Sequence, residues 1–402
     1  MFKKHLMAVL LSVITTVAGP ARAGVYDEGA TDTLIKIGNV TAASGPVAIY
    51  LPYKEALSRC FDKINADGGV NGRKIEFISY DDAYNPAKTV EQTRKLVESD
   101  GVLFLVGGVG TPTSLATAPY LARKKIPHLF VASSASKISD AAQFPLMMGW
   151  QPTAAQEGAI FGRYMVEKLG SSKIGILFQN DDFGRDFLAG LKEGLGSGNQ
   201  DKLVSAQPYE ATQPTVTSEI IQLKASGADA VYLAATGKFV AQAITAMRGI
   251  NWGPATFVPY LANSPAIVLK AAEITGDEKL FSSSFLIDVA DLAETSMPDV
   301  KEWLTWISTY YPKGNKTEPL NAWGWSVCQT VVHVLKQAGD TLTRDNIMAV
   351  ANSMHDYRPP LVSHGISLSS SPTQHRLVKC LQIQRLRSQR WSPEGDIICA
   401  ND

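Results

Sequence analysis

Small hydroxyl-bearing residues follow a glycine-rich stretch in the first third of the sequence, and their chemistry suits the binding of an anion. The apolar run 103–106 ends in Gly107-Gly108-Val109-Gly110, which is followed by Thr111 and Ser114. Glycines let backbone N–H groups turn outward and leave room for a ligand to approach. A helix beginning near Thr113 adds unpaired N–H groups and a positive dipole end. This corner suits a small anion, above all a carboxylate.

A second corner of the same kind follows the next predicted strand. The apolar run 129–132 leads into Ser133, Ser134, Ala135 and Ser136. Hydroxyl and backbone N–H groups are donors of the type that hold a carboxylate. Two such corners in succession favour a binding site, although an ordinary strand-to-helix turn has the same composition.

The glycines of the first corner also admit a second interpretation, a dinucleotide-binding fingerprint. Gly108-Val109-Gly110 matches the beginning of G-x-G-x-x-G, but Thr113 stands at the third glycine position and Pro112 interrupts the segment. No acidic residue stands where a ribose would require one. No nucleotide and no other cofactor is therefore expected.

Other residues that are often catalytic favour structural roles here. Asp181 and Asp182, like the pair 81–82, are typical of residues that solvate a turn or cap a helix. The histidines show no metal-ligand spacing, and nothing indicates a Ser-His-Asp triad. The chain is therefore not expected to be an enzyme. Four tryptophans are expected in packed regions more than on a ligand: Trp303, Trp306, Trp323 and Trp325.

Length, charge and the N-terminus indicate an exported globular protein. The 402 residues are enough for two domains, and 38 basic against 38 acidic residues argue against a nucleic-acid groove. Residues 1–23 combine a basic start, a short apolar run and the small-x-small site Ala21-Arg22-Ala23. This pattern predicts a signal peptide, with an N-terminal anchor as the alternative. A mature chain that begins at Gly24 is expected in the periplasm.

Four cysteines are present, and export permits disulfides. None forms a C-x-x-C pair, so a zinc site or a thioredoxin-like motif is not indicated. Cys380 and Cys399 flank a predicted hairpin, and their pairing is expected. Cys60 and Cys328 each lie on a predicted helix, either as buried free thiols or as a second bridge.

Predicted strands and helices alternate along two successive stretches of the chain. Such alternation is typical of parallel sheets with helices on both faces, and ligands bind beyond the carboxyl ends of their strands. The fold class expected is α/β, with two Rossmann-like lobes joined by a multi-strand hinge. Lobe 1 is expected over 24–153, completed by about 282–362, and lobe 2 over 154–281, completed by about 363–402.

The order of several short segments resembles the periplasmic ligand-binding proteins of ABC importers. More closely, the chain looks like the leucine/isoleucine/valine-binding protein family, which has the type I two-lobed fold. The resemblance covers essentially the whole mature chain. The segments that carry it are Ile37-Gly38, Ser44-Gly45, 65–75, Asp81-Asp82, Asp182-Phe183-Gly184, 226–231 and 335–339.

This resemblance implies ligand-binding roles for particular residues. In the family, hydroxyl and backbone groups at the first two corners hold the ligand carboxylate, and an aromatic residue of the second lobe closes over the ligand. The matching positions are Thr111 and Ser114, then Ser134, Ala135 and Ser136, with Phe183 where amino-acid binders usually carry tyrosine.

One position departs from the family pattern. Amino-acid binders hold the ligand ammonium with an acidic residue after the strand that matches 231–233, and Phe239 stands nearest that position here. A buried ammonium needs a counter-charge. A carboxylate with an apolar or aromatic body would suit Phe183, Thr236 and Phe239, and Tyr260 follows a later strand of the same lobe. The segments 81–86, 341–344 and 371–373 also look like a subgroup that includes aromatic-acid binders.

The sequence thus predicts a monomeric, periplasmic receptor that captures a small carboxylate between two lobes. Its expected partners are that ligand and the membrane subunits of an ABC permease, without nucleic acid. A branched-chain amino-acid binder, a sensory ligand-binding module and an exported hydrolase are the alternatives, and the last lacks a nucleophile–base motif.

Overall fold

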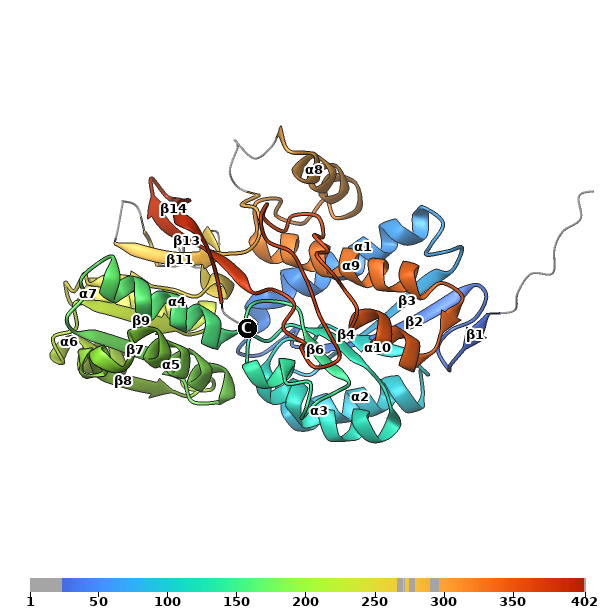
Figure 1. Cartoon of the computed structure of the whole chain (residues 1–402), viewed down its shortest axis with the longest axis horizontal. Coiled ribbons are helices and arrows are strands. Elements are labelled where there is room, and N and C mark those ends of the chain that lie inside the picture. The colour runs from blue at the N-terminus through green and yellow to red at the C-terminus, as the bar shows by residue number, and fades with distance from the viewer. Residues whose placement is uncertain (1–23, 266–269, 271, 275–278, 290–295, 401–402) are drawn as a thin grey trace, which may run out of the picture.

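The computed structural model describes residues 24–265, 270, 272–274, 279–289 and 296–400. The predicted signal peptide, 1–23, lies outside these residues. The described chain forms two α/β lobes that lie side by side (Figure 1). No helix in this part of the chain is long and apolar enough to cross a membrane.

The first lobe is built on a five-stranded parallel sheet in the order β3-β2-β4-β5-β6. Its helices cover both faces, as Figure 1 shows. A short parallel pair, β1 (Val25–Tyr26) with β12 (Thr341–Leu342), lies at its far end. The strands are β2 (Leu34–Thr41), β3 (Lys74–Asp81), β4 (Phe104–Val106), β5 (His128–Val131) and β6 (Met147–Gly149). The helices are η1 (Ala48–Tyr50), α1 (Leu51–Ala66), α2 (Pro86–Glu98), α3 (Thr111–Lys124), η2 (Ser136–Ser139), α8 (Pro298–Tyr310), α9 (Pro319–Ala338) and α10 (Arg344–Ala351).

The second lobe holds a seven-stranded sheet in the order β14-β13-β11-β10-β9-β7-β8. The five strands that come first in the chain, β7 to β11, run parallel. The terminal hairpin β13–β14 extends this sheet, because β13 pairs antiparallel with β11. The strands are β7 (Ile174–Gln179), β8 (Leu203–Tyr209), β9 (Ala230–Ala234), β10 (Ala255–Phe257), β11 (Leu280–Ser284), β13 (Cys380–Arg387) and β14 (Arg390–Cys399). The helices are α4 (Ala154–Glu167), α5 (Asp182–Leu195), η3 (Ser197–Lys202), α6 (Thr217–Ala225), α7 (Gly237–Gly249) and η4 (Tyr260–Ala262).

Continuously apolar strands account for helices on both faces of each sheet. Side chains alternate between the faces of a strand, so Phe104 and Val106 of β4 face one hydrophobic core while Leu105 faces another. In β9, Tyr232 and Val231 are divided in the same way between two cores. A strand that is buried on both faces favours a parallel sheet between helix layers, which is the predicted fold class.

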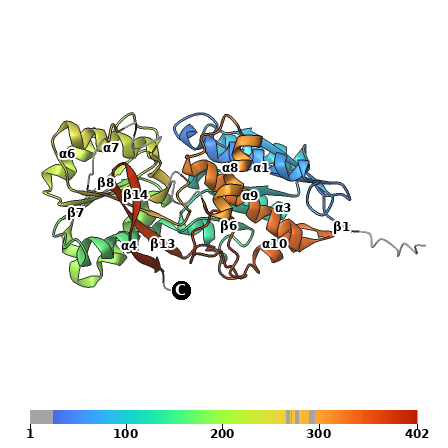
Figure 2. The ribbon, with the colours of Figure 1, turned by 90° about the horizontal axis from the view of Figure 1, so that it is seen from above.

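Two segments show where the chain passes between the lobes, and neither coincides with the expected boundary. The expected boundary at 281/282 falls within β11, all of which pairs in the second sheet. Residues just after 363 do not yet join lobe 2, because Leu368 pairs with Tyr357 and His375 Nδ1 donates to Met147 O at 2.8 Å. The chain enters the second sheet only at Cys380, at the start of β13. Figure 2 shows this terminal hairpin passing from the middle of the molecule onto the second lobe.

Candidate functional site

The two sheets share one topology, and this places a cleft between the lobes. Taken in chain order, the five parallel strands of each lobe lie in the order 2-1-3-4-5, so the connections reverse direction between β2 and β4 and again between β7 and β9. Ligands of open α/β sheets bind at such switch points, beyond the carboxyl ends of the strands. The turns after these four strands all contribute to one cavity.

This cavity, the ligand cleft, has an empty volume of about 420 Å³, part of which is open to solvent. None of the described residues that line it carries an acidic or a basic side chain. Small, hydroxyl-bearing and aromatic residues form its walls, a composition that suits a small, largely apolar ligand with one polar group. The lining residues are Val47, Tyr50, Tyr84, Val109, Gly110, Thr111, Ala132, Ser133, Ser134, Gln151, Phe183, Thr236, Leu261 and Trp323.

Glycine is required at the first corner by both conformation and space. Gly110 has φ +118°, a conformation that L side chains rarely adopt. A Cβ at this position would lie 2.4 Å from Cε2 of Tyr84. Helix α3 begins at the next residue, so its N-terminal backbone faces the cleft beside Thr111.

The two predicted corners lie against each other. Thr111 Oγ1 and Ser133 Oγ are 2.6 Å apart and share a hydrogen bond. Ser134 Oγ is buried and, among the described residues, has no hydrogen-bond partner of ordinary geometry. The same holds for Gln151 Oε1, on the turn after β6. A ligand that offers hydrogen-bonding atoms to these groups would relieve the cost of leaving them unpaired.

Three other predicted residues of these corners do not line the cleft. Ser114 is buried within α3. Ala135 packs in a small apolar cluster of the first lobe. The backbone N–H of Ser136 donates to the Asp186 carboxylate of α5, in the second lobe. This inter-lobe hydrogen bond, together with the Lys137–Asp182 ion pair of 3.5 Å, is a contact of a closed arrangement.

Aromatic residues from both lobes enclose the rest of the cleft. Phe183, the second residue of α5, lines the cleft from the second lobe and packs edge-to-face on Phe187, with 5.0 Å between the ring centroids. Trp323 of α9 lines the cleft with one face and lies 4.8 Å from the Tyr53 ring. Its Nε1 is buried and unpartnered among the described residues. Tyr50 completes the closure, since its hydroxyl donates to Leu261 O at 3.3 Å, across the lobes.

The second lobe contributes fewer of the predicted residues. Thr236 lines the cleft as the N-cap of α7. Phe239 lies in the first turn of α7, not in a turn before it. Its ring packs at a tilt against Tyr209, with 4.4 Å between the ring centroids, inside the second lobe's core. Tyr260 lies behind the cleft: its hydroxyl donates to Pro152 O at 2.9 Å, and it lines an adjoining cavity that shares Leu261 and Trp323.

One carboxyl group is fully buried beside the cleft. Burial raises the pKa of Glu157 to about 7, although hydrogen bonds from Ser283 Oγ, the Tyr260 N–H and the Tyr232 hydroxyl favour its charged form. No cation pairs with it among the described residues. Glu157 thus ties α4 to three other parts of the second lobe.

The acidic pairs act as the sequence indicates, in turns and caps. Asp181 is the N-cap of α5 and accepts from Gly184 N at 3.1 Å, while burial raises its pKa. Asp82 accepts from Tyr84 N at 2.8 Å and from Thr89 Oγ1. Hydrogen bonds from Ser44 and nearby backbone N–H groups lower the pKa of Asp81 to about 2, against the opposing effect of burial. Within the described residues no group of three His, Cys, Asp or Glu could hold a metal ion.

Several residues that line the cleft were not predicted to do so, because the sequence around each gives only a weak signal of a binding role. Gln151 follows β6, a three-residue strand too short for a periodic pattern. Trp323 was expected in packed regions, and it is both buried and on the cleft. Tyr84 lies in the 81–86 loop, which carried part of the family resemblance without a role for any one side chain.

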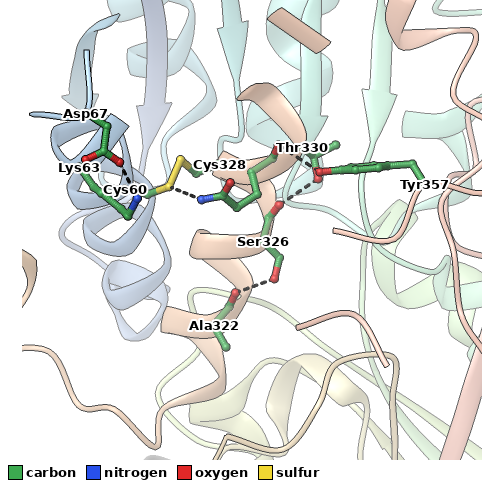
Figure 3. Close-up of a disulfide and its surroundings, with 9 residues drawn as sticks. Cys60, Lys63, Asp67, Ala322, Ser326, Cys328, Thr330 and Tyr357 are labelled. Atoms are coloured by element: carbon green, nitrogen blue, oxygen red, sulfur yellow. Dashed lines mark hydrogen bonds and ion pairs between the residues drawn. A yellow bond between two sulfur atoms is a disulfide. The ribbon is translucent and has the colours of Figure 1, made fainter. Parts of the chain in front are cut away.

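One disulfide joins two helices that are far apart in the sequence, and another joins two consecutive strands. Cys60 of α1 and Cys328 of α9 are bridged (Figure 3), and Gln329 Nε2 donates to Cys60 Sγ at 3.6 Å. Cys380 and Cys399 are bridged across the pair β13–β14, where they are direct partners in the strand register. The bridge between Cys380 and Cys399 is the one that the sequence predicts. For Cys60 and Cys328 the sequence left a bridge and two free thiols open, and the structure contains the bridge.

Comparison with known proteins identifies relatives of the same architecture. A family model described as "Periplasmic binding protein" matches residues 34–390. The Leu/Ile/Val-binding protein of Escherichia coli K12 is 26% identical over 199 residues, which cover 49% of this chain and 53% of that protein. The match thus spans about half the length of that relative.

Solved structures match over nearly the whole chain. A branched-chain amino acid ABC transporter protein from Thermus thermophilus, crystallised with bound valine, has a TM-score of 0.82 at 14% identity and covers 92% of this chain and 97% of its own. A solute-binding protein of an ABC transporter from Rhodopseudomonas palustris BisB5, in complex with 3,4-dihydroxy benzoic acid, has a TM-score of 0.77 at 22% identity, with 92% and 98% covered. At these identities the likeness concerns the fold.

Proposed function

The chain belongs to the periplasmic binding protein family, and on this premise we propose that it is a solute receptor of an ABC importer for a small organic carboxylate without an ammonium group. The receptor binds without changing its ligand chemically. The relatives are binding proteins of ABC transporters. The predicted signal peptide supports a periplasmic location, and the monomeric chain would present its closed form to permease subunits.

The observation that carries the choice of ligand is the uncharged lining of the cleft. A buried ammonium costs several kcal/mol unless a carboxylate pairs with it. The nearby carboxylates do not line the cleft and already accept hydrogen bonds: Asp181 from Gln179 Nε2 and Gly184 N, and Asp186 from Ser136 N. Glu157 likewise accepts from Tyr232, Tyr260 and Ser283 within the second lobe. An amino acid would therefore leave its ammonium without a counter-charge.

A carboxylate meets better conditions at the first-lobe wall. Thr111, Ser133 and Ser134 supply hydroxyl donors, and the N-terminus of α3 supplies a positive dipole end. Hydrogen bonds of this kind to an ionised group are stronger than those between neutral groups. The clustered Tyr84, Phe183 and Trp323 favour an aromatic body. The neighbour that holds 3,4-dihydroxy benzoic acid supports this ligand class.

A branched-chain amino acid is the second candidate, favoured by the relatives named for leucine, isoleucine and valine. Thermal unfolding with a panel of benzoate, 3,4-dihydroxybenzoate, hexanoate, leucine and valine separates the two. We expect the aromatic acids to raise Tm most, by several degrees at 100-fold over Kd, because binding at that excess adds about 2.7 kcal/mol. A response to leucine or valine alone would replace this proposal with the second candidate.

A further inference from the structure

The glycine corner of the ligand cleft, residues 107–110, contains three glycines with positive φ angles. Gly107, Gly108 and Gly110 have φ values of +69°, +86° and +118°. Because glycine adopts many backbone conformations at similar cost, such a segment does not fix the direction of its own peptide groups. That direction matters here, since none of the described lining residues is basic. Neutral donors must hold a carboxylate, and a carbonyl oxygen turned toward it would repel it.

The carbonyl oxygens of this corner accept hydrogen bonds inside the protein. Three of them are held by donors from the next strand or from the first turn of α3. These bonds run from Ala132 N to Gly108 O at 3.0 Å, from Thr113 Oγ1 to Val109 O at 3.1 Å, and from Ser114 N to Gly110 O at 3.3 Å.

Two more carbonyls depend on buried side chains of neighbouring strands. Asn39 Nδ2, on β2, donates to Val106 O at 2.8 Å. His128 Nε2, at the start of β5, lies 2.8 Å from Gly107 O. Since a carbonyl oxygen can only accept, Nε2 carries the proton. Neither Asn39 nor His128 lines the cleft, so these bonds direct both carbonyls into the first lobe and away from the ligand.

The rest of the His128 ring contributes little to stability. Its Nδ1 is buried and has no hydrogen-bond partner among the described residues, which costs free energy that a phenyl ring in the same space would not cost. Burial also lowers the pKa of His128 to about 4, against the opposing effect of its bond to Gly107. The ring is therefore neutral near pH 7 and is no counter-charge for an anion. The orientation of the Gly107 carbonyl is the effect that remains.

We propose that His128 is a positioning residue of the ligand cleft, and that it sets the preference for a carboxylate over the corresponding amide by holding the Gly107 carbonyl away from the ligand. This inference rests on the proposed function, because it concerns the same ligand. The NH2 group of an amide needs an acceptor, and the carbonyls of the corner are occupied. Without the bond from His128, the peptide group between Gly107 and Gly108 is free to turn, and its oxygen then weakens carboxylate binding.

Calorimetric titration of the full protein with benzoate and, separately, with benzamide tests this role; hexanoate and hexanamide take their place if wild type binds only the aliphatic acid. His128→Phe removes the donor and keeps a ring. We expect it to weaken binding of the acid by about tenfold or more, and binding of the amide by less than about threefold. His128→Gln keeps a donor of similar reach and should hold affinity for the acid within about threefold of wild type.

His375→Phe is the matched control. His375 is a second buried histidine whose ring donates to a backbone carbonyl, from Nδ1 to Met147 O at 2.8 Å, and whose other nitrogen has no partner among the described residues. Neither His375 nor Met147 lines the cleft. This variant loses the same kind of bond, so it should bind the acid as wild type does.

Loss of acid binding in His128→Phe that His128→Gln restores supports the proposal. Equal losses in the two phenylalanine variants, or equal losses for acid and amide, overturn it, because the effect would then be general to the fold. Unchanged binding by His128→Phe overturns this inference alone, whereas a wild type that binds neither acid overturns the proposed function and this inference with it. If His128→Phe fails to fold, His128→Asn replaces it, since its amide is one methylene shorter than that of His128→Gln and falls short of Gly107 O.

Discussion

The two lobes have the same strand order, yet their walls of the ligand cleft differ in chemistry. Among the described residues, the first lobe presents hydroxyl groups, glycine backbone and the unpartnered Ser134 and Gln151, together with the rings of Tyr84 and Trp323. The second presents Phe183, Leu261 and one hydroxyl residue, Thr236, whose Oγ1 is also without a partner there. Topology therefore sets where the two walls meet, and the residues after each strand decide what each wall does.

This difference indicates a division of labour between the lobes. A ligand that first meets the polar wall exchanges water for directional hydrogen bonds there, and the apolar wall then excludes the remaining water on closure. We expect the hydroxyl and glycine corners of the first lobe to determine affinity for the carboxylate, and the apolar residues of both lobes to determine preference for the ligand's body. The predictions that follow test this contrast, from the largest effect to the smallest.

The disulfides should stabilise the lobes unequally. Cys60 and Cys328 are 268 residues apart and Cys380 and Cys399 are 19 apart. In the chain-entropy account, removing the first pair by a double change to alanine should cost up to about 5 kcal/mol and removing the second about 3 kcal/mol. Urea unfolding of both variants, with reduced wild type as the control, measures the two losses. An equal loss would contradict the entropic account.

The second lobe should give a pH dependence of stability from the buried carboxyl of Glu157. Because the pKa of Glu157 is raised from 4.5 to about 7 in the folded protein, the folded state binds more protons than the unfolded state between these values. Its contribution to stability is present below pH 4.5 and falls by roughly 3 kcal/mol as the pH rises to about 7. Glu157→Gln should flatten this slope in urea unfolding measured across that range. A slope equal to that of wild type would assign it to other groups.

Adding a side chain at Gly110 should abolish most ligand binding. Gly110→Ala places a Cβ within 2.4 Å of the Tyr84 ring at a positive φ, and we expect affinity to fall by about 100-fold or more, or about 2.7 kcal/mol. Gly68→Ala is the matched control, since its φ is +109° but no atom lies within 4 Å of the added Cβ. Both variants bear backbone strain, and only the first should lose ligand in calorimetry.

The smallest expected effect separates the two walls directly. Ser134→Ala removes a buried hydroxyl that has no hydrogen-bond partner of ordinary geometry among the described residues, so it should weaken carboxylate binding by about tenfold while leaving the free energy of unfolding nearly unchanged. Thr236→Val, the equivalent change on the second wall, should alter affinity by less. If Thr236→Val has the larger effect, the carboxylate lies against the second lobe.

Much of the architecture could be predicted because its signals are local. The apolar runs of β4 and β9 with their following glycines, the periodic helices and the hairpin around Cys380 and Cys399 can all be recognised within short segments. Thr111 and Ser134 were expected together because they follow neighbouring parallel strands, whose carboxyl ends meet at one edge of a sheet. Phe183 and Thr236, from the other lobe, were expected only because of the family resemblance. Phe239 was misplaced because the apolar pattern predicts a helix from Val240, whereas α7 begins at Gly237 and includes Phe239 in its first turn.

The sequence by itself determined two alternating α/β units, hydroxyl and glycine corners after the strands, and the resemblance to a two-lobed binding family. Only the tertiary structure decided that Gln151 and Trp323 line the cleft, that Asp186 engages Ser136, and that Cys60 pairs with Cys328. The physical reason is the range of each interaction. Periodicity and turn chemistry act over a few residues, whereas these contacts join segments that meet only when the two lobes have packed and closed.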